Sequence, residues 1–173
     1  PNARWYIHEP VDFDIHRQAA SLAFGKPVSP YFKLDEANVI VSLDCDFIGE
    51  EEDTYISIRK FARRRNPEKS AKPMNRLYAV EGLFTLTGAN ADHRLRIPTS
   101  AVQGLAARLA LEVLRQKGGA PADLQSALSK LATGSTGNDA WIAECAKDLV
   151  AAGNANHSIV MAGHRQPVAT HLI

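Results

Sequence analysis

The feature that most constrains the fold is an apolar, largely β-branched run that stops abruptly at acidic residues. Residues 37–43 read Ala-Asn-Val-Ile-Val-Ser-Leu, and residues 44–46 are Asp-Cys-Asp. A nearly continuous apolar run of this length, ended by charges and then Gly49, is typical of a parallel strand buried on both faces. Ligands of open α/β sheets lie beyond the carboxyl ends of the strands, so these acids mark the edge where a site would be expected.

Strand and helix patterns alternate along the rest of the chain. Further strands are predicted at residues 76–80, 94–97 and 158–162, the first and last of them buried. Helices are predicted at residues 55–65, 100–117, 121–131 and 138–153, with a capping box at Ser100 and Gln103 and an N-cap at Asn138. Residues 83–90 are expected to form a loop. This order predicts an α/β fold: a three-layer, mostly parallel Rossmann-like sheet with helices on both faces.

Length and composition bound the domain organisation. The chain has 173 residues, of which 45% are hydrophobic and 23% charged, enough for one domain with a sizeable core. Residues 1–36 are predicted to be an extended lead-in packed on the body, with a helical period only around residues 16–24, and residues 37–173 the α/β domain. An amphipathic helix opens at Val168 and stops at Ile173, which predicts a C-terminally truncated fragment of a longer chain.

Charge and hydropathy exclude two kinds of partner. The net charge is +1, and no basic stripe is interleaved with aromatic residues, so nucleic acid is not expected to bind. No apolar run reaches the length of about 18 residues that a membrane-spanning helix needs. We therefore expect no nucleic acid partner and no direct membrane span.

The cysteines and histidines give little support for a metal or cluster. Cys45 and Cys145 lie far apart, and neither belongs to a Cys-x-x-Cys pair. Both are interpreted as small buried apolar residues, with a disulfide between them left open. In an extended chain Asp12, Asp14 and His16 would share one face and could chelate a metal, but a solvated face is the favoured interpretation. His164 and His171 would share a helix face, which is weak support for a metal. No metal site is predicted.

Charges also flank the first predicted helix. Residues 50–53 are acidic and residues 63–65 are arginines. This pattern complements the helix dipole, so helix stability alone accounts for it. An acidic metal site and a basic docking patch are the functional alternatives. Trp141, beside the apolar stripe of the last long helix, is interpreted as a packing anchor.

The strongest candidate site lies where the strand ends meet. Glu81 is expected beside Asp44 and Asp46, where an acid could accept the hydroxyls of a nucleotide ribose. The turn at Gly163 brings backbone N–H groups and Arg165 to the same edge, a geometry suited to an anion. Arg165 could equally neutralise the acids in an internal ion pair. No glycine-rich turn follows the first strand, and its acids would repel a pyrophosphate.

Several segments, taken in order, resemble the large-subunit domain of the molybdopterin oxidoreductases. The segments that carry the resemblance are residues 37–41, 57–65, 76–81 and 91–98. The last of these, Ala-Asp-His-Arg-Leu-Arg-Ile-Pro, is similar to an Ala-Asp-x-x-Leu-x-Ile-x-Pro-like strand of that family. The likeness spans roughly residues 37–163 and implies the domain that holds a pterin nucleotide in the family.

Departures from the family pattern fall on the segments that hold the nucleotide. Asp-Cys-Asp stands at the first turn, Glu-Gly-Leu ends the second strand at residues 81–83, and Thr-Ser-Ala follows Pro98. The scaffold positions are kept. The resemblance therefore implies an inherited framework without its cofactor.

A narrower resemblance, to the B subunits of bacterial alternative complex III, fits these departures. It rests on residues 6–14, 41–47, 74–78, 86–94 and 162–167. Those subunits join a molybdopterin-oxidoreductase-like half lacking molybdenum to an iron–sulfur half in a quinol-oxidising membrane complex. The resemblance implies a non-catalytic structural domain of a respiratory electron-transfer complex, peripheral to the periplasmic side of the bacterial inner membrane. Other subunits would be its partners, and iron–sulfur clusters would lie beyond Ile173.

Two other functions remain open. One is a genuine molybdopterin-guanine-dinucleotide-binding domain of an oxidoreductase. For this alternative the cofactor-binding residues would be Asp44, Asp46, Glu81, Gly163 and Arg165, and no catalytic residue is assigned. The other is a free-standing nucleotide or anion binder that uses residues 163–167.

Overall fold

The computed structural model describes residues 2–6, 8, 13–68, 70–132, 137–153 and 156–173. Four strands form one all-parallel sheet in the order β3-β2-β1-β4. Their bounds are Val39–Leu43 for β1, Arg76–Glu81 for β2, His93–Arg96 for β3 and Ser158–Ala162 for β4. The predicted α/β class and parallel sheet are confirmed.

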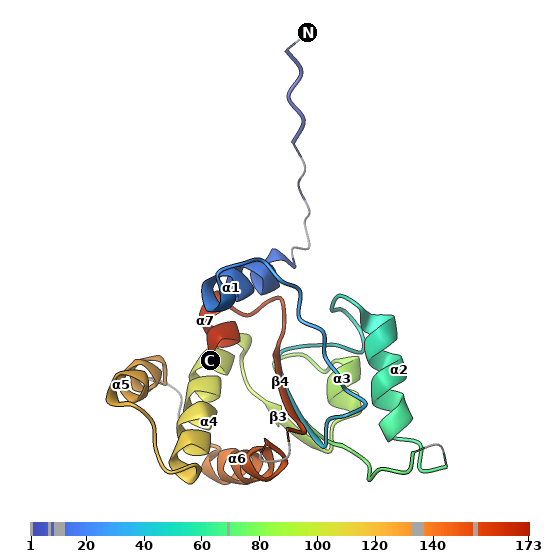
Figure 1. Cartoon of the computed structure of the whole chain (residues 1–173), viewed down its shortest axis with the longest axis vertical. Coiled ribbons are helices and arrows are strands. Elements are labelled where there is room, and N and C mark those ends of the chain that lie inside the picture. Colours follow the sequence, from blue (N-terminus) through green and yellow to red (C-terminus); the bar gives the residue numbers. More distant parts are fainter. Residues whose placement is uncertain (1, 7, 9–12, 69, 133–136, 154–155) are drawn as a thin grey trace.

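Helices cover both faces of this sheet (Figure 1). The helices are α1 Asp14–Phe24, α2 Thr54–Arg64, α3 Leu86–Ala89, α4 Val102–Gln116, α5 Ala122–Leu131, α6 Asp139–Gly153 and α7 Val168–Leu172. In Figure 1, α2 and α3 lie on one side of the sheet, and α4, α5 and α6 lie on the other. Helix α1 packs against α7 at the end of the sheet where the strands finish.

Strand β1 lies at the centre of the core, because its side chains pack against the helices on both faces of the sheet. All five of its residues are buried. Val41 packs into the cluster that contains Leu105 of α4 and Ile142 of α6. Ile40 points to the opposite face and packs with Phe61 of α2. The continuous apolar run in the sequence thus reflects burial on two faces, as predicted.

Strand β4 differs from the prediction of a buried strand. It forms the outer strand of the sheet beside β1, and half of the Val160 side chain (50%) is exposed. Met161 alone of the strand is buried. An apolar run does not by itself distinguish an inner strand, which is packed on both faces, from an edge strand that is packed on one.

Two local predictions are wrong. The expected loop at residues 83–90 contains the short helix α3, whose N-cap Thr85 accepts a hydrogen bond from the backbone N–H of Gly88. The capping box does not form, because residues 99–101 make a 3₁₀ turn and Ala101, without a side-chain cap, precedes α4. Helix α6 begins directly after Asn138 and buries the predicted stripe of Ile142, Cys145, Ala146 and Leu149.

The N-terminal segment is not extended throughout. It contains α1, and further on Leu34 is completely buried in the core. Trp5 and Tyr6 are exposed, at 89% and 79%, and residues 2–6 lie away from the rest of the chain in Figure 1. None of the helices in the described ranges combines the length and apolarity that crossing a membrane would require.

A close contact between two turns locks β4 to β1. Gly163 donates its N–H to the carbonyl of Leu43 at 3.0 Å. A Cβ atom at position 163 would overlap the backbone carbonyl of Asp44, so a larger residue cannot fit unless one turn moves. The glycine that the sequence suggested for anion binding is therefore required for packing.

We expect Gly163→Ala to lower the free energy of unfolding by about 1–3 kcal/mol, because the added methyl group meets backbone and not a flexible side chain. Urea denaturation measures the effect. Gly153→Ala is the control, since a Cβ there would meet only the Ser158 hydroxyl at 3.2 Å and alanine favours the helix. Equal destabilisation by both substitutions would contradict the predicted contact.

Candidate functional site

The carboxyl edge of the sheet brings Asp44, Asp46 and Glu81 to the ends of neighbouring strands, but each side chain is bound by a different part of the protein. Asp46 is buried, and its Oδ1 accepts hydrogen bonds from the Thr87 backbone N–H at 2.9 Å and the Thr87 hydroxyl at 2.7 Å. Its carboxylate is therefore turned toward helix α3.

Glu81 is held in the same way. It is 3% exposed and forms an ion pair with Arg94 Nε at 2.5 Å. Its other oxygen accepts the Thr85 hydroxyl at 2.6 Å. A Cβ at Gly88 would overlap the Glu81 carboxylate, which shows how closely α3 packs on it.

Asp44 accepts a hydrogen bond from the side-chain amide of Gln166 at 3.0 Å. Gln166 is 2% exposed and also donates to the carbonyl of Thr99 at 3.3 Å. The backbone at Asp44 has φ 52°, in the left-handed region that Asp tolerates better than most residues. This contact ties the turns after β1 and β4 to the start of α4.

Arg165 does not pair with any of these three acids. It forms an ion pair with Glu50, and both side chains are nearly half exposed. The predicted neutralisation of Asp44 and Glu81 by Arg165 is thus wrong. Their partners, Gln166 and Arg94, come from turns and strands that the sequence did not link to them.

A second cluster lies beside this edge and was not predicted. Glu51, whose side chain is 7% exposed, accepts hydrogen bonds from the backbone N–H of His164 at 3.0 Å and contacts its ring nitrogen Nδ1 at 2.9 Å. Its second oxygen lies 3.3 Å from Nε2 of His16. Burial alone would raise the pKa of Glu51, but these hydrogen bonds hold it below its usual value. The cluster joins α1 to the turn after β4.

His171 of α7 completes the packing around this cluster. Its ring meets that of His16 edge to face, with centroids 4.9 Å apart. Burial, followed by the charge of His16, lowers the pKa of His171. Its Nε2 atom is buried and has no hydrogen-bond partner among the described residues.

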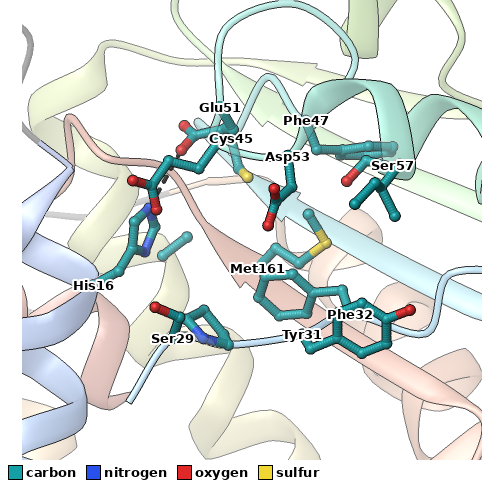
Figure 2. A pocket seen from close by; sticks show the side chains of 14 residues that line it. His16, Ser29, Tyr31, Phe32, Cys45, Phe47, Glu51, Asp53, Ser57 and Met161 are labelled. Atoms are coloured by element: carbon teal, nitrogen blue, oxygen red, sulfur yellow. Dashed lines mark hydrogen bonds and ion pairs between the residues drawn. The ribbon is translucent and has the colours of Figure 1, made fainter. Parts of the chain in front are cut away.

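The cluster forms one wall of a cavity of about 350 Å³, which we call the α1–α2 cavity (Figure 2). The lining residues are His16, Ser29, Pro30, Tyr31, Phe32, Cys45, Phe47, Glu51, Glu52, Asp53, Ile56, Ser57, Met161 and Ala162. The cavity adjoins β1 and β4. These strands meet where the sheet order reverses, the position at which open α/β sheets bind ligands. The predicted site residues, Asp44, Asp46, Glu81, Gly163 and Arg165, lie in or beside the turns nearby but do not line it. His16 and the acids at residues 51–53, which were considered only as weak metal candidates, do line it.

The remaining sequence candidates serve the fold. Arg64 is 3% exposed and donates to the carbonyls of Pro73 and Asp35, and Arg65 pairs with Asp92, so these two arginines do not form a docking patch. Trp141 packs against the core, edge to face with Tyr78, as expected of an anchor.

The cysteine and metal candidates are placed as follows. Cys45 and Cys145 are both buried and free, which confirms the interpretation of small apolar residues and leaves no disulfide. Asp14 and His16 lie in helix α1, so they do not alternate on an extended face; Asp12 is outside the described residues. Within the described ranges, no group of three or more His, Cys, Asp or Glu side chains is arranged to hold a metal ion.

The order of the acids along the chain does not indicate these pairings. Thr87 lies 41 residues from Asp46, and Glu51 lies 113 residues from His164. The sequence does hold one indication of such contacts. Acids so close to a core strand are expected to be buried, and a buried carboxylate needs hydrogen-bond donors. The available donors, Thr85, Thr87 and Gln166, are common residue types whose positions only the fold reveals.

Comparison with known proteins does not place the chain in a family. A scan against protein-family models finds no match, and a search of curated proteins finds none either. The arrangement of the site must therefore be interpreted from its own contacts.

Replacing Thr87 by Val should lower the free energy of unfolding by about 1–3 kcal/mol, because the Asp46 carboxylate loses a donor and the N–H of Ile48 loses its acceptor. The matched control is Thr170→Val. Thr170 is equally buried, but its hydroxyl has no partner among the described residues, so a methyl group there should be neutral or stabilising. Denaturant unfolding measures the free energy of unfolding of both variants. An equal change in the two variants would disprove the role of Thr87.

His171 should make the fold sensitive to mild acid. The pKa of His171 is lowered from its usual value of 6.5 in the folded state. At a pH below 6.5 the unfolded chain therefore binds a proton at His171 more readily than the folded chain does. The free energy of unfolding should fall as the pH decreases from 6.5 through the lowered pKa. His171→Gln should flatten this slope, whereas His8→Gln, at an exposed position, should not. An unchanged slope in His171→Gln would contradict the prediction.

Proposed function

We propose that this chain is a non-catalytic structural domain of a respiratory electron-transfer complex that oxidises quinol. In this proposal it is a molybdopterin-oxidoreductase-like domain without a bound pterin cofactor. The observation that best supports the proposal is the internal pairing of the strand-end acids. Asp46 binds Thr87 and Glu81 binds Arg94, so neither carboxylate is directed to a ligand.

The backbone donors at the same edge are also occupied. A phosphate at a strand-to-helix turn is bound by free N–H groups. Here Asp44 donates its N–H to Val80 at 2.7 Å, Gly163 donates to Leu43 at 3.0 Å, and His164 donates to Glu51 at 3.0 Å. A nucleotide could bind in this place only if several of these bonds were broken.

The partners and the location rest on the resemblance to B subunits of alternative complex III. They are other subunits of a membrane-bound complex, including an iron–sulfur part, at the periplasmic side of the inner membrane. An edge whose acids Asp46 and Glu81 are hydrogen-bonded within the domain is suited to a structural role, because such a polar network holds the neighbouring turns in place.

The second candidate is a genuine molybdopterin-guanine-dinucleotide-binding domain. One observation favours it: Asp44 and Glu81 do follow neighbouring parallel strands, where a ribose would be bound. For this function Arg94 and Gln166 would have to release the two acids.

The full-length protein isolated from its native membranes should contain iron–sulfur clusters but no stoichiometric molybdenum, and should co-purify with other subunits of a quinol-oxidising complex. Elemental analysis and visible spectroscopy measure the two properties. A molybdopterin oxidoreductase isolated from the same membranes is the control that shows whether the cofactor survives the procedure. One molybdenum per chain would favour the second candidate, and purification without electron-transfer subunits would contradict the first.

A further inference from the structure

Strand β4 leaves one edge of the sheet unpaired within the described ranges. The carbonyl of His157, just before β4, accepts the N–H of Val39 of β1 at 3.2 Å. Every second residue of a parallel strand bonds to the same neighbour, so the residues between them turn their backbone groups to the other side. The N–H and C=O groups of Ser158, Val160 and Ala162 therefore face outward, and no described residue forms a hydrogen bond with them.

The two edges of the sheet differ in charge. At the far edge, β3 reads His-Arg-Leu-Arg, and charged side chains on an edge strand oppose the addition of another strand. Strand β4 reads Ser-Ile-Val-Met-Ala, with neither charge nor proline, and Val160 at its centre is half exposed. An edge of this kind is a ready template for a further strand.

A hollow of about 220 Å³ lies beside the amino end of β4. Its apolar lining includes Tyr31, Phe32 and Ile159. An added strand is held by backbone hydrogen bonds along the edge and by side chains that fill neighbouring pockets. The edge of β4 offers both components, and aromatic side chains are the commonest anchors in pockets of this kind.

The N-terminal arm, which we define as residues 2–6, carries side chains of this type. Trp5 and Tyr6 are almost fully exposed, and the arm lies away from the body of its own chain (Figure 1). It has no helical or strand structure of its own. Tryptophan and tyrosine favour strands and are enriched among the residues that dominate protein interfaces. The fold of the single chain gives these two side chains no partner among the described residues.

The arm joins the body close to the open edge. The ring of Phe13, just before α1, lies 4.7 Å from the ring of His164, which follows β4 by two residues. The start of the arm and the edge of β4 thus belong to the same region of the surface. When two copies face each other across a two-fold axis in this region, each arm meets the edge of the other copy, so the contact is reciprocal and closed.

We propose that the chain forms a two-fold dimer in which the arm of each copy adds as a further strand to β4 of the other. The backbone of the arm pairs with the outward groups of Ser158, Val160 and Ala162, and Trp5 fills the hollow beside Ile159. One contact then provides partners for both features that the single chain leaves unpaired. This dimer does not depend on the proposed respiratory role.

Sedimentation velocity of the full chain measures the assembly. We expect a monomer–dimer equilibrium with a dissociation constant in the micromolar range, because two short arms bury an area at the low end for specific interfaces. The double variant Trp5→Ala, Tyr6→Ala should dimerise at least about tenfold more weakly. Tyr55→Ala removes an equally exposed aromatic side chain from α2 and should leave the dissociation constant unchanged. A chain that is still monomeric at about 1 mM would overturn the proposal.

Val160→Lys tests the edge, because a lysine on an edge strand opposes the addition of another strand. This variant should also dimerise at least about tenfold more weakly, and circular dichroism should show that it is folded. A mixture of Val160→Lys with the double arm variant should associate more strongly than either alone, because the intact arm of the first fits the intact edge of the second. Direct pairing of β4 with β4 predicts instead that the arm variant keeps wild-type affinity and that mixing gives no gain. Either of these results would overturn the proposal.

Discussion

The buried carboxylate of Asp46 is the interaction on which the carboxyl edge depends. Its side chain is bound by Thr87 from beyond the next strand, and its backbone carbonyl accepts the N–H groups of Gly49, Glu50 and Glu51. One residue therefore fixes both the direction of the loop after β1 and the position of α3. Gly49 must be glycine, because a Cβ there would overlap the Asp46 carboxylate. This buried carboxylate is stabilised by the two donors of Thr87, which both bind its Oδ1 atom.

The orientation of this loop determines what the neighbouring acids can do. Glu50 is turned outward to Arg165, and Glu51 is turned inward to the two histidines. The acids that a sequence reader would group as one negative patch are thus divided among an exposed ion pair, a buried hydrogen-bonded cluster and a cavity wall. What each of these acids can bind therefore depends on its own partner and not on the net charge of the group.

The sequence was a good guide to the elements and a poor guide to their polar contacts. The apolar run at residues 37–43 predicted a strand buried on both faces, and helical spacing predicted the buried stripe of α6, because burial and periodicity are local properties of the chain. The edge position of β4 could not be predicted, since strand order depends on which helix covers which face. The pairing of Glu81 with Arg94 was equally hidden, because both residues have several possible partners until the strands are placed in register.

The same loop also determines the shape of the cavity beside the strand ends. Asp44 and Asp46 are bound on the side facing α3 and α4, where Gly163 brings the two turns into contact. Across the loop, Glu51 draws α1 toward β4, and the chain then enters α2 through the left-handed Asp53. The contacts that fill the first side are therefore the ones that shape the second.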